Sequence, residues 1–148
     1  MKNAVIRLMA AGAGLCMLLG GGALSAAAAP ASADAASARV GTSFNDRLFP
    51  GQYISNGRYR LEMQRDGNLV LYDDSWGRAC WASNTNGIDG VYADYDDSLW
   101  TKPSLYLKSG YGELRHWWGM YNYLHKTGNV SVNTKGEVWI AYQKFVSC

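Results

Sequence analysis

One stretch of the sequence decides the fold: Arg58-Tyr59-Arg60-Leu61-Glu62-Met63-Gln64-Arg65-Asp66-Gly67-Asn68-Leu69-Val70-Leu71-Tyr72. Apolar and polar side chains alternate on both sides of Asp66-Gly67, and this dipeptide between two alternating runs is a strong β-hairpin signal. A three-residue loop, 65–67, places the regularly spaced apolar side chains on one face: Leu61, Met63, Leu69 and Leu71. A two-residue loop would mix polar and apolar side chains on both faces. We therefore predict the longer loop, an apolar face in the core, and a positive φ at Gly67.

The opposite face of this hairpin carries two amides, a carboxylate, a small apolar side chain and a phenol: Gln64, Asn68, Asp66, Val70 and Tyr72. A sugar presents hydroxyls that both donate and accept hydrogen bonds, above an apolar ring face. The amides and the phenol can do both, the carboxylate can only accept, and the valine can lie against ring carbons. From residue types alone, this face is either a sugar-binding surface or an ordinary solvated one.

The rest of the chain has the same short alternating pattern. With 148 residues there is room for one domain of ordinary size. After Ala38, apolar residues recur at every second position in short runs that Gly, Asn and Asp interrupt, which is typical of all-β proteins. No stretch in this part has an apolar stripe at helical spacing. The sequence therefore predicts a single, nearly helix-free domain.

The N-terminus has the pattern of an export signal. Lys2 and Arg7 give a basic start, and residues 8–33 then run without a charge to small side chains. We expect cleavage after Ala33, although cleavage after Ala38 also satisfies the small-residue rule. The predicted organisation is a cleaved signal peptide, a short linker and one domain: 1–33, 34–43 and 44–148. This organisation predicts a secreted protein.

The alternative to cleavage is a retained membrane anchor. Gly20-Gly21-Gly22 and the Ala/Ser/Pro-rich stretch that follows make a poor membrane-spanning helix. We therefore expect no membrane insertion after signal cleavage.

The charge balance bears on the class of binding partner, and the cysteine content bears on the redox compartment. Removal of residues 1–33 from the 148 leaves 115 residues, with basic and acidic side chains in equal number. This balance gives no indication of a nucleic-acid partner. Cys80 and Cys148 remain, and an exported chain with two cysteines invites one disulfide, within a chain or between chains. Two separate thiols are the alternative.

The hairpin also carries a family motif. Residues 64–72 match in full the QxDxNxVxY motif of the bulb-type, or monocot mannose-binding, lectins. Gly57-Arg58-Tyr59-Arg60-Leu61 precedes the motif, and Trp81-Ala82-Ser83-Asn84-Thr85 follows at the spacing of the WASNT segment of that family. The chain therefore resembles these lectins from about Leu48 to Thr85, and its long Ala-rich leader resembles that of a secreted bacterial member.

The resemblance implies a fold and a site. The fold is a β-prism II, with three four-stranded antiparallel sheets and pseudo-threefold symmetry. Gln64 would bond the mannose 3-hydroxyl, Asp66 and Asn68 the 2-hydroxyl, and Tyr72 the 4-hydroxyl, while Val70 would contact C3 and C4. The 2-hydroxyl is axial in mannose and not in glucose, so Asp66 and Asn68 would discriminate between them. No metal or other cofactor is required.

Two decayed copies of the motif complete the expected threefold pattern. Residues 130–141 align with 61–72 without a gap, and they carry other side chains at the five binding positions: Asn133, Lys135, Glu137, Trp139 and Ala141. We expect Lys135 to pair with Glu137. Residues 105–117 align with one extra loop residue, and the binders are replaced by Lys108, Glu113, Arg115 and Trp117. One working site per chain predicts weak monovalent binding of mannose-type glycans, and crosslinking would need a homodimer or a larger assembly.

The adjacent tryptophans, an acidic segment and the two histidines are the other candidate functional residues. One of Trp117 and Trp118 should face the core and the other solvent, because neighbouring side chains in a strand alternate. Residues 94–97 lack the pattern of a calcium loop and are expected to be solvated. His116 and His125 have no partners at metal or catalytic spacing, so we predict no enzyme. The alternative function is a secreted, bacteriocin-like interaction protein that binds a protein or another envelope polysaccharide.

Overall fold

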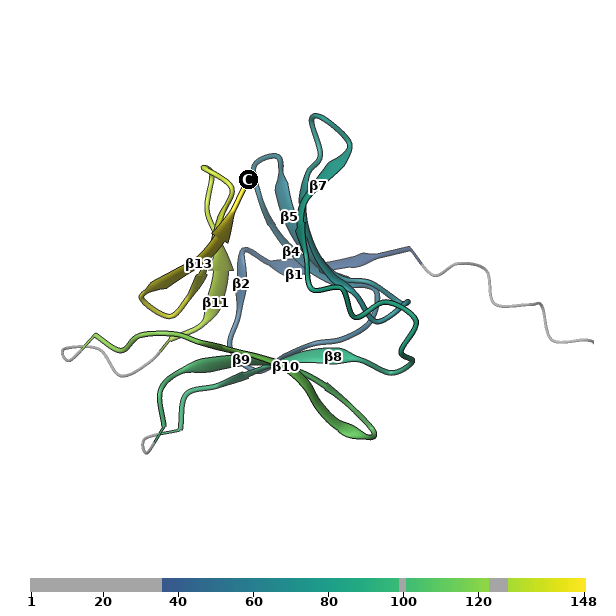
Figure 1. Cartoon of the computed structure of the whole chain (residues 1–148). Helices are drawn as coiled ribbons and strands as arrows, with labels where there is room; N and C mark the ends of the chain where they lie inside the picture. The colour runs from purple at the N-terminus through teal and green to yellow at the C-terminus, as the bar shows by residue number, and fades with distance from the viewer. Residues whose placement is uncertain (1–35, 99–100, 123–127) are drawn as a thin grey trace, which may run out of the picture. The chain divides into compact units, whose positions relative to one another are not determined.

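The chain forms β-strands throughout the part that can be described. The structure is a computed structural model that describes residues 36–98, 101–122 and 128–148, and these residues form thirteen strands and no helix (Figure 1). None of the described residues belongs to a helix that could cross a membrane. The predicted signal peptide, 1–33, lies outside the described residues, as does His125.

The strands are organised in three sheets. The first has the order β1 (Ala38–Gly41), β4 (Gln52–Asn56), β5 (Tyr59–Met63), β6 (Leu69–Asp73), β7 (Arg78–Ala82). The second has the order β10 (Gly112–Trp118), β9 (Ser104–Ser109), β8 (Tyr92–Asp96), β3 (Arg47–Leu48). The third has the order β13 (Gln143–Ser147), β12 (Glu137–Ile140), β11 (Val130–Val132), β2 (Ser43–Phe44). The three-sheet prediction is confirmed.

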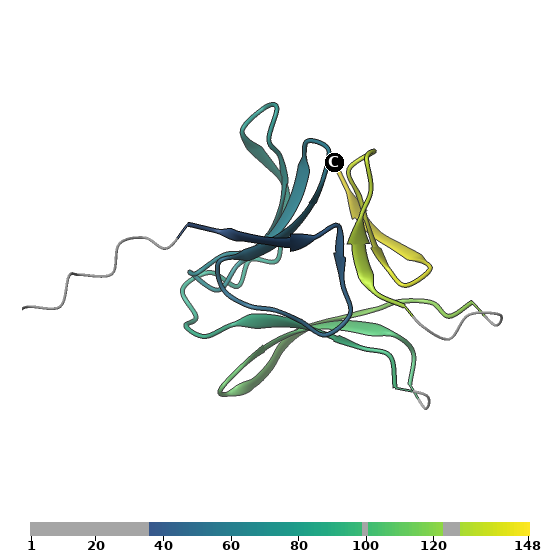
Figure 2. The ribbon, with the colours of Figure 1, turned by 180° about the vertical axis from the view of Figure 1, so that it is seen from behind.

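The first sheet has a fifth strand that the sequence did not predict. Strand β1 lies within the segment expected to be a linker, 34–43, and pairs in parallel with β4 (Figure 2). Arg39 holds it there, since its guanidinium donates to the hydroxyl and to the carbonyl oxygen of Ser55, at 2.7 and 2.9 Å. The remaining pairings of this sheet are antiparallel.

The central hairpin of the first sheet has the predicted register. Met63 pairs with Leu69 and Leu61 with Leu71, and all four side chains are fully buried. The backbone N–H of Gln64 donates to the carbonyl oxygen of Asn68 at 2.8 Å, which closes the three-residue loop. Burial of each such side chain stabilises the fold by about 1.5–3 kcal/mol.

The third sheet repeats this arrangement. Val130 pairs with Ile140 and Val132 with Val138, and these four side chains are at most 2% exposed. They join the inner face of the first hairpin in one core cluster. The alignment of residues 130–141 with the first copy is therefore confirmed in its apolar positions.

The second copy differs from the prediction after Glu113. A bulge between Glu113 and Arg115 shifts the alternation of β10, so that His116 lies opposite Tyr106 and Trp118 opposite Ser104. Trp117 consequently packs inward, with ring centroids 5.6 Å from Trp81 and 5.0 Å from Phe145. Trp118 is 56% exposed. The predicted outward placement of Trp117 was wrong, whereas the expectation that the two tryptophans face opposite ways is confirmed.

A disulfide joins the first and third sheets. Cys80 of β7 is bonded to Cys148, which follows β13, so the bridge lies within the chain. Cys80 occupies an irregular position in β7, between Ala79, which pairs with Tyr72, and Trp81, which pairs with Leu71. This irregularity allows Trp81 to enter the core while Cys80 reaches the end of the third sheet.

Candidate functional site

The five predicted binding residues lie along one hairpin of the first sheet. Gln64 directly follows β5, Asp66 and Asn68 flank the turn glycine, and Val70 and Tyr72 lie on β6. Asp66 is exposed, while Gln64, Asn68 and Tyr72 are half-buried. Gln64, Asp66 and Asn68 thus lie at the turn end of the hairpin, and Tyr72 lies further along β6.

Gln64 and Tyr72 contact each other directly. The Gln64 Nε2 donates to the Tyr72 hydroxyl at 2.8 Å. By strand register this bond spans the cross-strand pair Glu62–Val70. Val70 is only 2% exposed, which differs from its expected place on a solvent-facing surface. The Gln64–Tyr72 hydrogen bond crosses this position, a contact that strand alternation does not reveal.

An arginine fixes the ring of Tyr72. The Arg60 guanidinium carbon lies 4.8 Å from the centroid of the Tyr72 ring and 5.5 Å from that of Tyr53. Its nitrogens also bond the Asp74 carboxylate, at 3.1 to 3.2 Å, and Glu62. Burial opposes the charge of Arg60, but the Asp74 hydrogen bonds and the charge of Glu62 outweigh it and raise the arginine pKa. Arg60 was missed as a site residue, although alternation places it on the same face as Gln64.

The turn holds its polar groups in fixed orientations. The backbone N–H of Asn68 donates to Asp66 Oδ1 at 3.0 Å. The Asn68 side-chain oxygen accepts from the Ser83 hydroxyl at 2.9 Å and from the backbone N–H of Thr85 at 3.3 Å. The remaining polar group of the Asn68 side chain is its NH₂ donor. A carboxylate acceptor and an amide donor are therefore presented side by side.

Ser83 and Thr85 are buried behind this turn, at 6% and 3% exposure. The Ser83 hydroxyl accepts from the backbone N–H of Leu69 at 2.9 Å, and the Thr85 hydroxyl donates to the Gly67 carbonyl at 2.7 Å. Sequence reasoning recognised the segment 81–85 only as a marker of the family. The spacing of its two hydroxyls, two residues apart on one face, was the available signal for a supporting role.

Gly67 is required in this turn for two reasons. Its φ is 90°, as predicted, which disfavours any residue with a side chain. In addition, a Cβ at this position would lie 2.2 Å from the carbonyl oxygen of Ile88. The loop that follows β7 therefore packs directly on the turn and helps to fix its shape.

The equivalent face of the third sheet is occupied by internal contacts. Asn133 donates to Glu137 at 2.7 Å, and the Lys144 ammonium lies 3.5 Å from the same carboxylate. The hydrogen bond from Asn133, and next the charge of Lys144, lower the pKa of Glu137. The predicted pair of Lys135 with Glu137 is not formed. Lys135 lies in the turn, whereas Lys144 lies on β13, the strand beside Glu137.

The outer face of the second sheet is aromatic. The Tyr106, His116 and Trp118 rings are stacked in a row, with centroid distances of 4.1 and 4.0 Å. The Lys108 ammonium lies 4.5 Å from the Tyr106 ring centroid. Because of the bulge, His116 and Trp118 lie where Arg115 and Trp117 were expected among the replaced binders.

Asp94 has specific partners, in contrast to the solvated loop predicted for residues 94–97. It lies in β8 and is 9% exposed. Its carboxylate contacts Lys108 at 2.6 Å and Arg47 at 3.1 Å. Within the described ranges, no group of three or more His, Cys, Asp or Glu residues is placed to hold a metal ion.

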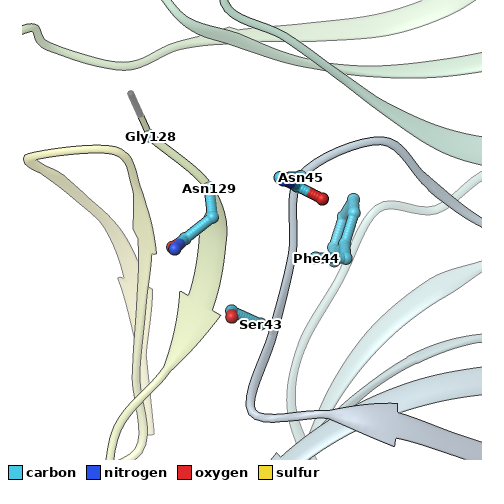
Figure 3. Close-up of a pocket in the computed structure, with 5 residues that line it drawn as sticks. All are labelled: Ser43, Phe44, Asn45, Gly128 and Asn129. Atoms are coloured by element: carbon cyan, nitrogen blue, oxygen red, sulfur yellow. The ribbon is translucent and has the colours of Figure 1, made fainter. Parts of the chain in front are cut away.

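A separate pocket of about 360 Å³ lies beside β2 of the third sheet, where the chain leaves β2 and where it enters β11 (Figure 3). It is lined by Ser43, Phe44, Asn45, Gly128 and Asn129. Asn45 and Asn129 come from the two chain segments that diverge beyond the Phe44–Val130 pair. This pocket shares no residue with the site on the first sheet.

Sequence comparison relates part of the chain to plant lectins. A mannose-specific lectin from Narcissus pseudonarcissus is 50% identical over 44 residues, which are 30% of this chain and 38% of that protein. A mannose-specific lectin from Aloe arborescens is 54% identical over 41 residues, 28% of this chain and 36% of that protein. The chain thus spans little more than a third of the length of these relatives. No protein-family profile matches the chain.

Structural comparison extends the similarity to most of the domain. A lectin from Allium sativum has a TM-score of 0.53 at 28% identity, covering 72% of this chain and 95% of that one. A monomeric monocot mannose-binding lectin from Gastrodia elata has a TM-score of 0.52 at 27% identity, covering 66% of this chain and 82% of that one. Together with the three sheets, these similarities define the fold as a β-prism. More particularly, it is the β-prism II of the bulb-type lectins. These relatives are lectins, in agreement with the prediction that the chain is not an enzyme.

Proposed function

We propose that this protein is a secreted lectin that binds mannose or mannose-containing glycans through Gln64, Asp66, Asn68, Val70 and Tyr72. The observation that carries the proposal is the preorganised turn, in which Asp66 Oδ1 accepts from the Asn68 backbone and the Asn68 side-chain oxygen is bound from behind. One sugar hydroxyl can donate to the Asp66 carboxylate and accept from the Asn68 NH₂ at the same time.

The other end of the site can bind sugar without losing its own hydrogen bond. Tyr72 accepts from Gln64, so its hydroxyl hydrogen remains available to the 4-hydroxyl of a mannoside. Gln64 keeps its oxygen and its second amide hydrogen for the 3-hydroxyl. Val70 supplies apolar contact only where the sugar reaches past the Gln64–Tyr72 bridge, so we assign it the smallest share of the affinity.

The valency of glycan binding follows from the single intact copy of the motif. A shallow site that binds one sugar is weak on its own, and strength comes from linking several sites. We propose weak monovalent binding by one chain, with crosslinking of glycans only in a homodimer or larger assembly. The leader of residues 1–33 supports export, and the disulfide between Cys80 and Cys148 suits an oxidising compartment.

The test is an NMR amide-shift titration of residues 34–148 with methyl α-mannoside, with the galactoside as control. We expect saturable shifts confined to residues 64–72 and no response to the galactoside. Asp66→Asn should weaken binding about tenfold or more, because a charge-assisted acceptor is lost. The matched control is Lys135→Ala, at the corresponding position of the third sheet. Absence of shifts at tens of millimolar mannoside would refute the proposal.

A further inference from the structure

We infer that Ser83, together with the backbone N–H of Thr85, is a positioning element that sets the sugar selectivity of the proposed site. It does so by holding Asn68 with its NH₂ group toward the ligand. This inference rests on the proposed function. Ser83 and Thr85 lie outside the five-residue motif and contact the turn from the segment after β7.

The Thr85 backbone N–H and the Ser83 hydroxyl decide the orientation of the Asn68 amide. A backbone N–H can only donate a hydrogen bond, so the Asn68 atom 3.3 Å from the Thr85 nitrogen must be the oxygen. The Ser83 hydroxyl supports the same assignment from 2.9 Å. Rotation of the amide by half a turn would bring the NH₂ group against the Thr85 N–H, which is two donors facing each other.

The hydrogens of the two hydroxyls make this arrangement directional. The Gly67 carbonyl only accepts, so the Thr85 hydroxyl hydrogen is used there, at 2.7 Å. The Ser83 oxygen already accepts from the Leu69 N–H at 2.9 Å. The Ser83 hydroxyl hydrogen is therefore available to the Asn68 oxygen, and it is shared with the Thr85 oxygen, 2.7 Å away. Because both hydroxyls are buried, water cannot readily replace them.

This directionality has a consequence for the ligand. With Asn68 fixed as a donor beside the Asp66 acceptor, the pair is complementary to a single hydroxyl that donates to one and accepts from the other. An axial hydroxyl at C2 can meet both groups, whereas the equatorial epimer leaves one of them unpaired. If the Asn68 amide could rotate, its oxygen would lie beside the Asp66 carboxylate, and two acceptors would not distinguish the epimers in this way.

The experiment compares Ser83→Ala with the wild type by NMR titration against methyl α-mannoside and methyl α-glucoside. We expect mannoside affinity to fall by about two- to tenfold, which corresponds to one neutral hydrogen bond, and the mannoside-to-glucoside ratio to fall with it. The side-chain NH₂ signals of Asn68 should also shift or broaden, while the change in the mannoside-to-glucoside ratio is the result that a purely structural role would not cause. The matched control is Ser75→Ala, which removes a hydroxyl bonded to Asp73 in the same sheet.

A second variant keeps the test decisive if Ser83→Ala does not fold. Asn68→Asp replaces the NH₂ group by an oxygen of the same size, so mannoside binding should be lost if this group faces the ligand. An unchanged epimer ratio in a folded Ser83→Ala protein would overturn the inference while the proposed function stands. Retained binding by Asn68→Asp would overturn the inference together with the role given to Asn68 in the proposed site, although mannoside binding by the wild type would still support a lectin. A wild-type protein that binds neither sugar would overturn both.

Discussion

Removal of the disulfide between Cys80 and Cys148 is the most quantitative perturbation that the fold allows. The bridge joins residues that are 68 positions apart. In the chain-entropy description, removing the bridge returns conformational entropy to the unfolded chain. This lowers the free energy of unfolding by about 4 kcal/mol. The whole free energy of unfolding of a domain this size is about 5–15 kcal/mol. The double variant Cys80→Ala/Cys148→Ala should therefore lose roughly a quarter to four-fifths of its free energy of unfolding.

The assay is urea unfolding followed by tryptophan fluorescence. With a denaturant slope of about 1.5 kcal/mol per molar, the loss corresponds to a midpoint roughly 2 to 3 M lower than that of the wild type. The wild type with a reducing agent is the control, and it should match the double variant. A midpoint that falls by less than about 0.5 M in both would show that the bridge does not constrain the unfolded chain. Disulfide-linked dimers of the wild type would show that the pairing itself is wrong.

Two further predictions concern the register of β10 and the charge on the third sheet. Trp117→Ala should lower the free energy of unfolding by roughly 3 kcal/mol and Trp118→Ala by less than about 1 kcal/mol, because only the Trp117 ring packs in the core. Chemical denaturation measures both values, and a larger loss for Trp118→Ala than for Trp117→Ala would contradict the register of β10. The hydrogen bond from Asn133 lowers the pKa of Glu137. The ionised carboxylate therefore stabilises the folded state fully above the ordinary pKa of 4.5, and this stabilisation is lost as the pH falls through the lowered pKa. The difference in urea midpoint between the wild type and Glu137→Gln should therefore be largest at about pH 6 and should shrink steadily below pH 4.5. A difference that does not change with pH would contradict the lowered pKa of Glu137.

The hairpin of β5 and β6 was predictable because several local signals agree there. Alternation, the Asp66-Gly67 turn and the need for positive φ at Gly67 all select the same three-residue loop. The apolar positions of β11 and β12 followed from alignment with this hairpin. Such features depend on neighbours in the sequence. The bridge between Cys80 and Cys148 was one of the alternatives that the cysteine count left open, and the structure places it within the chain.

Features that depend on distant contacts were not predictable in this way. The extra loop residue lies where the alignment placed it, because Glu113 pairs with Lys108. The bulge after Glu113 is a further irregularity that residue types do not indicate, so Trp117 was misassigned to the outer face. Val70 is buried although strand alternation places it on the solvent-facing side of the hairpin. The support of Asn68 by Ser83 comes from a segment fifteen residues away. Each of these requires tertiary geometry that residue types alone leave open.

The bulge in β10 also shows how such a protein can change its ligand without changing its core. One bulged residue exchanges which of two adjacent tryptophans meets solvent and which meets the interior. Without the bulge, the register of the Glu113–Lys108 pair would continue and would place Arg115 opposite Tyr106 and Trp117 opposite Ser104, where His116 and Trp118 now lie. In this scaffold, a bulge within a strand can therefore change which side chains form an outer face, and sequence alignments that score only matched positions would miss that route.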